Sequence, residues 1–208
     1  MTDSLVTLSA TAARDLLGQR RSVRALQDGP LPDGMLEALG SAIDSTPAAF
    51  GMSPWQVVLL HERRGMFWDV VERSFREHLT GEQLDRYLTR LDGFRPAVVV
   101  AMVYEDLSVR ERLVSERGLS SETGFDFALQ GLGMVQLGMW LAATGFGLGA
   151  SLQHWDWMVE AALAEFAGLP QACFRLVSVM PFGHPAEDAS TPAGDRPHAW
   201  VIDPRTDV

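Results

Sequence analysis

The long apolar segment over residues 128–150 limits most strongly how this chain can fold. Its pattern predicts a helix over residues 121–144, in which Gln130, Gln136 and Thr144 interrupt the apolar side chains. These polar residues, together with several glycines suited to close packing, favour a buried core helix over a membrane span. A buried helix must be covered by other elements, so we expect it to form the centre of a single domain over residues 1–208.

Runs of apolar and β-branched residues predict the strands that accompany this helix. The clearest runs are residues 55–61, 96–104 and 174–180, and a shorter one covers 148–152. The continuous apolar character of 55–61 predicts a position inside a sheet, and the prolines and glycine at 181–185 are expected to end the strand before them. Helices are expected at residues 9–18, 35–43, 63–79, 82–91, 106–117 and 157–166. Strands scattered among helices indicate an α+β fold.

The acidic composition narrows the choice of partners. A net charge of −10 and a pI near 4.9 argue against binding to nucleic acid or to an anionic membrane, because both depend on positive surface charge. The N-terminus has no basic region before an apolar stretch, so we expect no signal peptide and a cytoplasmic location.

Missing residue types exclude several kinds of catalysis. The sequence has no lysine, which excludes a Schiff base with pyridoxal phosphate and a P-loop lysine. The single cysteine, Cys173, excludes an internal disulfide and a cysteine-ligated metal cluster, and its apolar neighbours predict a buried, inert thiol. The five histidines lack the spacing of metal ligands, and no HExxH or GxSxG motif occurs. We therefore expect no metal site and assign no catalytic side chain.

Three arginines and a serine lie within residues 20–24, at the predicted end of the first helix. Arginine forks match phosphate oxygens, and a serine hydroxyl can donate one further hydrogen bond, so this cluster predicts a phosphate site. The loop over residues 46–54 consists largely of small residues between two prolines and suits close approach to a ligand. The glycines at 145–149 end a helix and precede a strand, the reverse of a dinucleotide fingerprint, so Gly145 is expected to cap the helix. Together these features predict a bound cofactor that performs its own chemistry.

Four segments of the chain resemble the FMN-dependent nitroreductases, in the order in which that family carries them. They are residues 20–24, 47–55, 147–154 and 180–187. The chain is most similar to the short branch that includes the fungal fatty-acid repression mutant proteins. This resemblance implies an α/β/α sandwich with a mostly antiparallel sheet, a long buried central helix, and an intertwined homodimer with FMN at the subunit interface. Residues 186–208 would be a C-terminal extension that packs on the partner subunit.

The resemblance also implies a set of cofactor-binding residues. These are Arg20, Arg21, Ser22, Arg24, Phe50, Gly51, Ser53, Ser151, Leu152, Gln153, His154 and Arg196. Within this set, residues 20–22 would hold the phosphate and ribityl chain, Arg24 would lie toward the polar edge of the flavin, and Arg196 would add a phosphate contact. Residues 151–154 would contact the ring mainly through their backbone, with one N–H directed at N5.

The function implied by the resemblance is that of an oxidoreductase. NAD(P)H would pass hydride to flavin N5, and a small-molecule electron acceptor, such as a nitroaromatic or a quinone, would be reduced in a ping-pong pattern. The branch usually has Asn-Ser-Gln where this chain has Gly51, Met52 and Ser53, which predicts weaker or retuned FMN binding. Two alternatives stay open: a flavin-binding or sensing protein without efficient turnover, and a structural dimer with a vestigial pocket.

Overall fold

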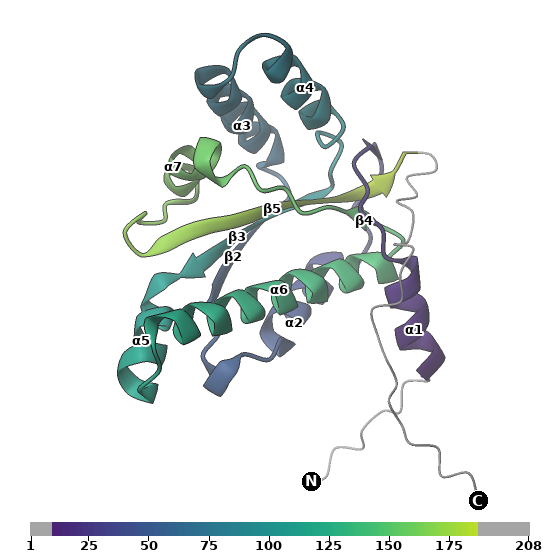
Figure 1. Ribbon diagram of the computed structural model, residues 1–208. Coiled ribbons are helices and arrows are strands. Elements are labelled where there is room, and N and C mark those ends of the chain that lie inside the picture. Colours follow the sequence, from purple (N-terminus) through teal and green to yellow (C-terminus); the bar gives the residue numbers. More distant parts are fainter. Residues whose placement is uncertain (1–9, 187–208) are drawn as a thin grey trace, which may run out of the picture.

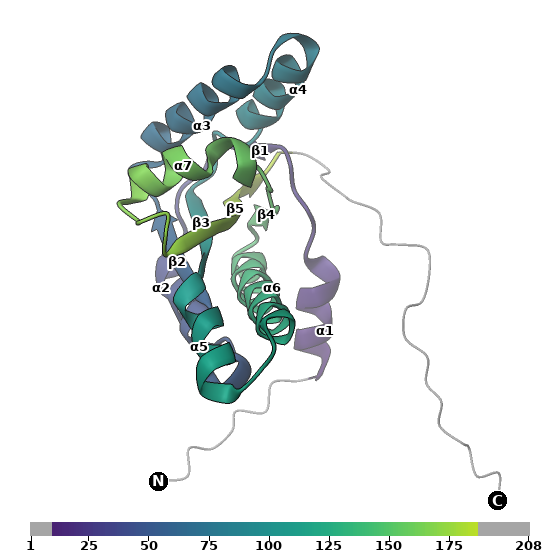
Figure 2. The same ribbon diagram turned by 60° about the vertical axis from the view of Figure 1, so that its left-hand side comes forward.

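The computed structural model describes residues 10–186, which form a sheet covered by helices on both faces (Figure 1). In chain order the elements are α1 (Ala10–Gln19), β1 (Leu26–Gln27), α2 (Met35–Ser45), the 3-10 helix η1 (Ala49–Gly51), β2 (Trp55–Leu60), α3 (Arg64–His78), α4 (Gly81–Asp92), β3 (Val99–Asp106), α5 (Leu107–Arg117), α6 (Ser121–Gly145), β4 (Gly149–Ala150), α7 (Asp156–Ala167) and β5 (Phe174–Pro185). Helices α2 and α6 cover one face, and α3, α4 and α7 cover the other (Figure 2). The predicted α/β/α sandwich is confirmed.

The ladders between the described strands are all antiparallel, in the order β1-β5-β3-β2, with β4 paired to β5 beside this path. Residues 55–61 were predicted to lie inside the sheet, but among residues 10–186 β2 pairs with β3 alone and forms an edge. Helices on both faces explain its apolar sequence. Val57 and Leu59 join the core under α2 and α6, whereas Val58 and Leu60 join the core under α3, α4 and α7.

Alternate residues of β3 enter these two separate cores. Val99, Ala101 and Val103 pack with α2 and α6, whereas Val100 and Met102 pack with α3 and α7. All five side chains are fully buried. Burying a side chain of this kind stabilises a fold by about 1.5–3 kcal/mol for the larger residues. The predicted burial of this strand on both faces is confirmed, and β3 joins the two helical layers.

Helix α6 corresponds to the predicted central helix and begins after Ser120, whose side chain accepts a hydrogen bond from the Thr123 backbone at 3.1 Å. By length and composition alone it could cross a membrane, but one of its faces packs against the sheet and α2. The side chains of Leu129, Met134 and Leu137 are each 40% exposed on its other side. We call these three residues the open face of α6.

Three local predictions were wrong. Strand β5 continues to Pro185, because β4 and β1 pair with its last residues and the φ of proline is compatible with an extended backbone. Cys173 is exposed, since it lies in the turn that precedes β5. Gly147 has the left-handed φ of 73° that follows α6, whereas Gly145 is the last residue of the helix itself.

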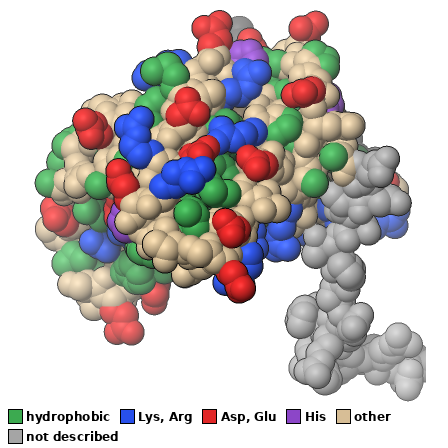
Figure 3. Space-filling model, turned by 90° about the horizontal axis from the view of Figure 1, so that it is seen from above, with side chains coloured by type: hydrophobic (Ala, Val, Ile, Leu, Met, Phe, Trp, Pro, Cys, Tyr) green, Lys and Arg blue, Asp and Glu red, His purple; other side chains and the backbone are tan. Residues whose placement is uncertain are grey.

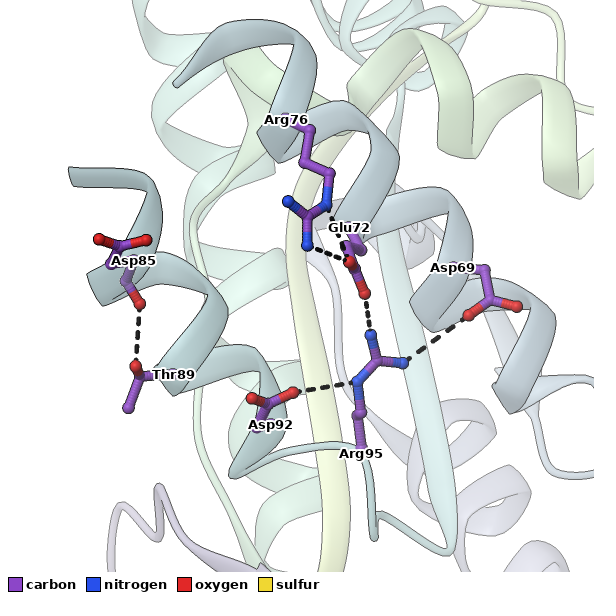
Figure 4. Close-up of polar contacts among 7 residues, drawn as sticks. All are labelled: Asp69, Glu72, Arg76, Asp85, Thr89, Asp92 and Arg95. Carbon is purple, nitrogen blue, oxygen red and sulfur yellow. Dashed lines mark hydrogen bonds and ion pairs between the residues drawn. The ribbon is translucent and has the colours of Figure 1, made fainter. Parts of the chain in front are cut away.

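Arg95 ties α3 to the end of α4 on one face of the sheet (Figure 4). Its guanidinium contacts Glu72, lies 3.8 Å from Asp69 Oδ1, and donates through Nε to Asp92 Oδ1 at 3.2 Å. Arg76 also donates to Glu72, at 2.9 and 2.7 Å. The hydrogen bond from Arg76, aided by the charges of both arginines, holds the pKa of Glu72 below its ordinary value of 4.5. Acidic and basic side chains are interleaved over this side of the molecule (Figure 3).

Replacing Arg95→Gln is expected to lower the free energy of unfolding by about 1 kcal/mol at pH 7. Because the folded-state pKa of Glu72 is depressed, its stabilising contribution is present above the ordinary pKa and is lost as pH falls through the folded value. In urea unfolding, the difference between the wild type and Arg95→Gln should therefore shrink from pH 7 to pH 3.

The matched control is Arg112→Gln, which removes an exposed pair with Glu116 on α5. It should change the free energy of unfolding by less than about 0.5 kcal/mol. A loss in Arg95→Gln that is the same at pH 7 and pH 3 would show that the Glu72 carboxylate does not carry the effect.

Candidate functional site

The arginine segment (residues 20–24) leaves the end of α1 and runs beside β4. The backbone N–H of Val23 donates to the carbonyl of Ala150 at 2.9 Å, and Ser22 forms a parallel bridge with the same residue. The arginine segment and β4 can approach each other closely because residue 149 is glycine. A Cβ on Gly149 would lie 2.4 Å from Cγ2 of the buried Val23. This close packing fixes the position of the serine and of the arginines around it.

Trp140 of α6 holds the arginine segment from the helix side. Its indole Nε1 donates to the carbonyl of Arg21 at 3.2 Å, and the guanidinium carbon of Arg20 lies 4.6 Å from the centroid of its ring. A cation over a tryptophan ring contributes about 0.5–2 kcal/mol. Sequence reasoning missed this role, because a tryptophan within a predicted core helix is ordinarily a packing residue.

The loop before β3 holds the other end of the segment. The N–H of Leu26 donates to the carbonyl of Gly93 at 2.8 Å. A Cβ on Gly93 would lie 2.6 Å from the carbonyl oxygen of Arg24, so the two backbones also meet here without room for a side chain. The segment is therefore fixed at both ends by backbone contacts, and its arginine side chains project from a rigid support.

The three arginines differ in their own contacts. Nη1 of Arg21 donates to the carbonyls of Gly18 and Arg20, the latter at 2.9 Å, and thereby closes the end of α1. The side chain of Arg24 is exposed. Among residues 10–186, no carboxylate forms an ion pair with Arg20 or Arg24. Their guanidinium groups can therefore accept an anionic ligand without breaking an ion pair of the described chain.

The chain after β4 lies beside the arginine segment and is held on the sheet. Gln153 exchanges two backbone hydrogen bonds with Val179 of β5, both 2.9 Å long, and its Nε2 donates to Oγ of Ser151 at 2.9 Å. Ser151 and Gln153 are buried, Leu152 is half-buried and His154 is exposed. The two buried side chains pair with each other, which leaves the backbone of this stretch in a defined conformation.

The loop that contains η1 lies near the other end of α6. The ring centroid of Phe50 is 6.2 Å from that of Phe127, and the guanidinium carbon of Arg117 is 5.0 Å from the Phe50 ring. Because a helix rises 1.5 Å per residue, the part of α6 from Phe127 to Trp140 spans about 20 Å. Within one chain the loop is therefore well separated from the arginine segment.

Two consecutive left-handed residues shape this loop. Phe50 has a φ of 56° and Gly51 a φ of 70°. The next side chain, Met52, is buried in a small cluster with Val109 and Leu113 of α5. Met52 therefore belongs to the core and is not part of a ligand-binding surface in this chain.

The expected cofactor-binding residues thus fall into two groups. The first comprises Arg20, Arg21, Ser22, Arg24, Ser151, Leu152, Gln153 and His154, which the structure brings together around β4. The second comprises Phe50, Gly51 and Ser53, which it places at the η1 loop. Arg196 lies outside the described residues. Within residues 10–186, no three His, Cys, Asp or Glu side chains gather as ligands for a metal ion.

The model of the Nitroreductase family matches residues 17–184, which include both groups of residues around β4 and η1. The chain belongs to this family. The match begins within α1 and ends within β5, so it covers nearly the whole described fold.

Individual relatives agree with this assignment. HBN1 of Saccharomyces cerevisiae, a protein named as a candidate nitroreductase, is 27% identical over 176 residues, which cover 82% of this chain and 86% of HBN1. The nitroreductase CinD from Lactococcus lactis, solved with chloramphenicol, has a TM-score of 0.75 at 23% identity, over 92% of this chain and 99% of CinD. The FMN-dependent nitroreductase NfnB from Mycobacterium smegmatis, solved with NADPH, has a TM-score of 0.67 at 17% identity, over 86% and 90% of the two chains. The shared fold is thereby established.

Replacing Gly149→Ala is expected to lower the free energy of unfolding by about 1–3 kcal/mol, because the new methyl group would overlap Val23 in a closely packed site. Val23→Ala makes room for this methyl group, so the additional cost of Gly149→Ala should be smaller in that background. Urea unfolding of the four proteins in this cycle measures the coupling.

The control is Gly40→Ala in α2, where an added Cβ meets nothing within 4 Å. This change should leave stability equal or raise it by up to about 1 kcal/mol, since alanine favours a helix over glycine. Additive losses from Gly149→Ala and Val23→Ala would contradict the packing argument.

Proposed function

We propose that this protein is an FMN-dependent oxidoreductase that takes hydride from NAD(P)H and reduces small-molecule acceptors such as nitroaromatics or quinones. The observation that carries the proposal is the arginine segment, which contacts with Ala150 and Trp140 hold in place and in which Arg20 and Arg24 form no ion pair within residues 10–186. The FMN-dependent NfnB, solved with NADPH, has the same fold and supports this choice of cofactor and electron donor.

The residues of the arginine segment fit a phosphate group. Arg20 and Arg24 carry planar forks of donors that match phosphate oxygens, and Ser22 lies between them. We infer that Arg20, Arg21 and Ser22 hold the phosphate and ribityl chain, and that Arg24 faces the polar edge of the flavin. Arg196, outside the described residues, would add a further phosphate contact.

When bound, FMN supplies N5 as the hydride-accepting atom, so the protein needs to bind and orient rather than to provide a nucleophile. The backbone around Leu152 is available for this purpose, because the neighbouring Ser151 and Gln153 side chains turn inward and bond to each other. A backbone N–H of residues 151–154 would be directed at N5. The positive charge of Arg24 would stabilise negative charge at the polar edge.

We infer a homodimer in which each flavin site is completed by a second copy of the chain. Two observations support this inference. The open face of α6 exposes apolar side chains that a partner would cover, and about 20 Å of helix separates the η1 loop from the arginine segment in one chain. The η1 loop of the partner subunit would supply the second group of cofactor contacts, and residues 186–208 would pack on that partner.

The remaining parts of the proposal follow from composition. Residues 1–208 would form a single domain that works in the cytoplasm on small molecules. The net charge of −10 supports the expectation that neither nucleic acid nor an anionic membrane is a partner.

A second candidate function is a flavin-binding or sensing protein without efficient turnover. It is favoured by the η1 loop, where Gly51 and Ser53 offer no side-chain amide and the Met52 side chain is buried. Anaerobic addition of NADPH separates the two candidates, because only the oxidoreductase should lose its flavin absorbance rapidly.

The purified protein is expected to carry FMN, detected by its visible absorbance. Replacing Arg20→Ala together with Ser22→Ala should weaken FMN binding by about a hundredfold or more, because two groups are lost and hydrogen bonds to a charged group each contribute about 1.5–3 kcal/mol. Fluorescence titration with FMN measures the change. Arg14→Ala, at an exposed α1 arginine paired with Asp15, is the control and should bind FMN as the wild type does. Unchanged FMN retention in the double variant would refute the phosphate assignment.

Initial rates with NADPH and a quinone are expected to give parallel lines in double-reciprocal plots. The reason is that donor and acceptor would use the same flavin face in turn, so the oxidised donor must leave before the acceptor binds. Intersecting lines that reflect a ternary complex would count against this mechanism.

A further inference from the structure

A cavity lies between α5 and the N-terminal end of α6. It has a volume of about 410 Å³ and is lined by Arg110, Glu111, Val114, Ser121 and Phe125. This volume falls within the range of small-molecule sites, about 300–1,000 Å³. The part of α6 from the cavity to Trp140 spans about 20 Å, so the cavity is distinct from the arginine segment of the same chain.

The cavity residue Arg110 has the carboxylate of Glu105 nearby. Within the described chain, Glu105 is the only carboxylate that contacts both Arg110 and Arg175. Glu105 is fully buried at the end of β3. Its Oε2 accepts a hydrogen bond from Nε of Arg175 at 2.8 Å, and Nη2 of Arg175 lies 2.7 Å from the same oxygen. Its Oε1 lies 3.7 Å from Nη1 of Arg110 and has no hydrogen-bond partner among residues 10–186. Arg175 therefore engages Glu105 closely, whereas Arg110 does not.

Arg110 is consequently a cation with unused hydrogen-bonding capacity. Its guanidinium carbon lies 5.7 Å from the Phe125 ring centroid, a contact that uses none of its N–H donors. Its ion-pair contact with Glu105, at 3.7 Å between Nη1 and Oε1, is beyond hydrogen-bond distance. Ser121, the first residue of α6, brings the positive end of the helix dipole to the same cavity. A carboxylate placed here would meet the Arg110 fork and the helix end together.

The other cavity residues restrict the ligand further. Val114 and Phe125 provide apolar contacts suited to a ring. Arg110 is the one cation among the described lining residues and Glu111 adds a negative charge, so the first acid group can pair with Arg110, whereas a second acid group would be repelled without a partner. The cavity therefore suits a ring with one acid group and disfavours both neutral and dianionic analogues.

We propose that this cavity binds a monoanionic aromatic carboxylate through Arg110 and the N-terminal end of α6. The acid group is held by the Arg110 fork, and the ring lies against Val114 and Phe125. The proposal concerns the chain itself and does not depend on the flavin chemistry proposed above.

Calorimetric titration of the purified full-length protein with benzoate tests this site. Arg110→Gln should raise the dissociation constant for benzoate by about ten- to a hundredfold, because it removes a charge-assisted pair. Arg110→Lys keeps the charge but loses the fork and should give an intermediate value. Arg112→Gln, at an exposed arginine of the same helix, is the matched control and should bind benzoate as the wild type does.

Two further ligands and a second variant complete the experiment. Benzamide, which is neutral, and terephthalate, which carries two acid groups, should both bind more weakly than benzoate. Phe125→Leu should weaken benzoate binding while leaving Arg110 in place, which keeps the test decisive if Arg110→Gln lowers the melting temperature. Equal affinity for benzoate and benzamide, or unchanged benzoate binding in Arg110→Gln and Phe125→Leu, would overturn the proposal.

The variant with Arg20→Ala and Ser22→Ala distinguishes this cavity from the flavin site. Benzoate affinity should be unchanged in that variant even when FMN is lost. If benzoate binding disappears together with FMN, the acid binds at the flavin and the proposed cavity site is wrong. Conversely, a protein that binds benzoate through Arg110 but never binds FMN would refute the proposed function and leave this inference intact.

Discussion

The burial of β3 on both faces is the constraint on which the rest of this structure depends. A strand whose consecutive side chains, here Val99 to Val103, are all apolar must be covered on both faces, and here α6 and α2 occupy one face while α3 and α7 occupy the other. Strand β5 pairs along the whole of β3 and continues past Val99, so that its last residues also pair with β4 and β1. The arginine segment attaches at this end of β5, so its position follows from the packing of the central strand.

The candidate flavin site is built mainly by backbone contacts. Val23 meets Ala150, Leu26 meets Gly93, and two glycines permit distances that no other residue would allow. Such a support fixes the backbone that carries the arginines and leaves the donors of Arg20 and Arg24 to a ligand, which favours pre-organised recognition of an anion. Helix α6 then sets the distance between this support and the η1 loop of the same chain. In the proposed homodimer, the arginine segment of one chain would meet the η1 loop of the second copy.

The sequence predicted the elements well because the periodicity of apolar residues reports burial directly. It could not distinguish an edge strand from an interior one at β2, since helices on both faces give the same apolar pattern as neighbouring strands do. The arginine motif could be predicted as a phosphate site from its residue types, a role that stays a prediction. Trp140 could not be found, because its contacts with Arg20 and Arg21 join residues that are far apart in the sequence. The exposure of Cys173 and the true end of β5 were missed for a related reason. Both predictions used only neighbouring residues in the sequence, whereas the exposure of Cys173 depends on a turn and the length of β5 depends on its strand partners.

Because Phe50 has a left-handed conformation, the shape of the η1 loop depends on the residues that contact Phe50. A residue with a side chain loses about 1–2 kcal/mol in this conformation, so the loop depends on the contacts of Phe50 with Phe127 and Arg117. Those two residues belong to α6 and α5, so a substitution at either position would alter the loop without any change in the loop sequence itself. Members of a lineage with identical loops could thus present different surfaces, and comparison of loop sequences alone would not reveal the divergence.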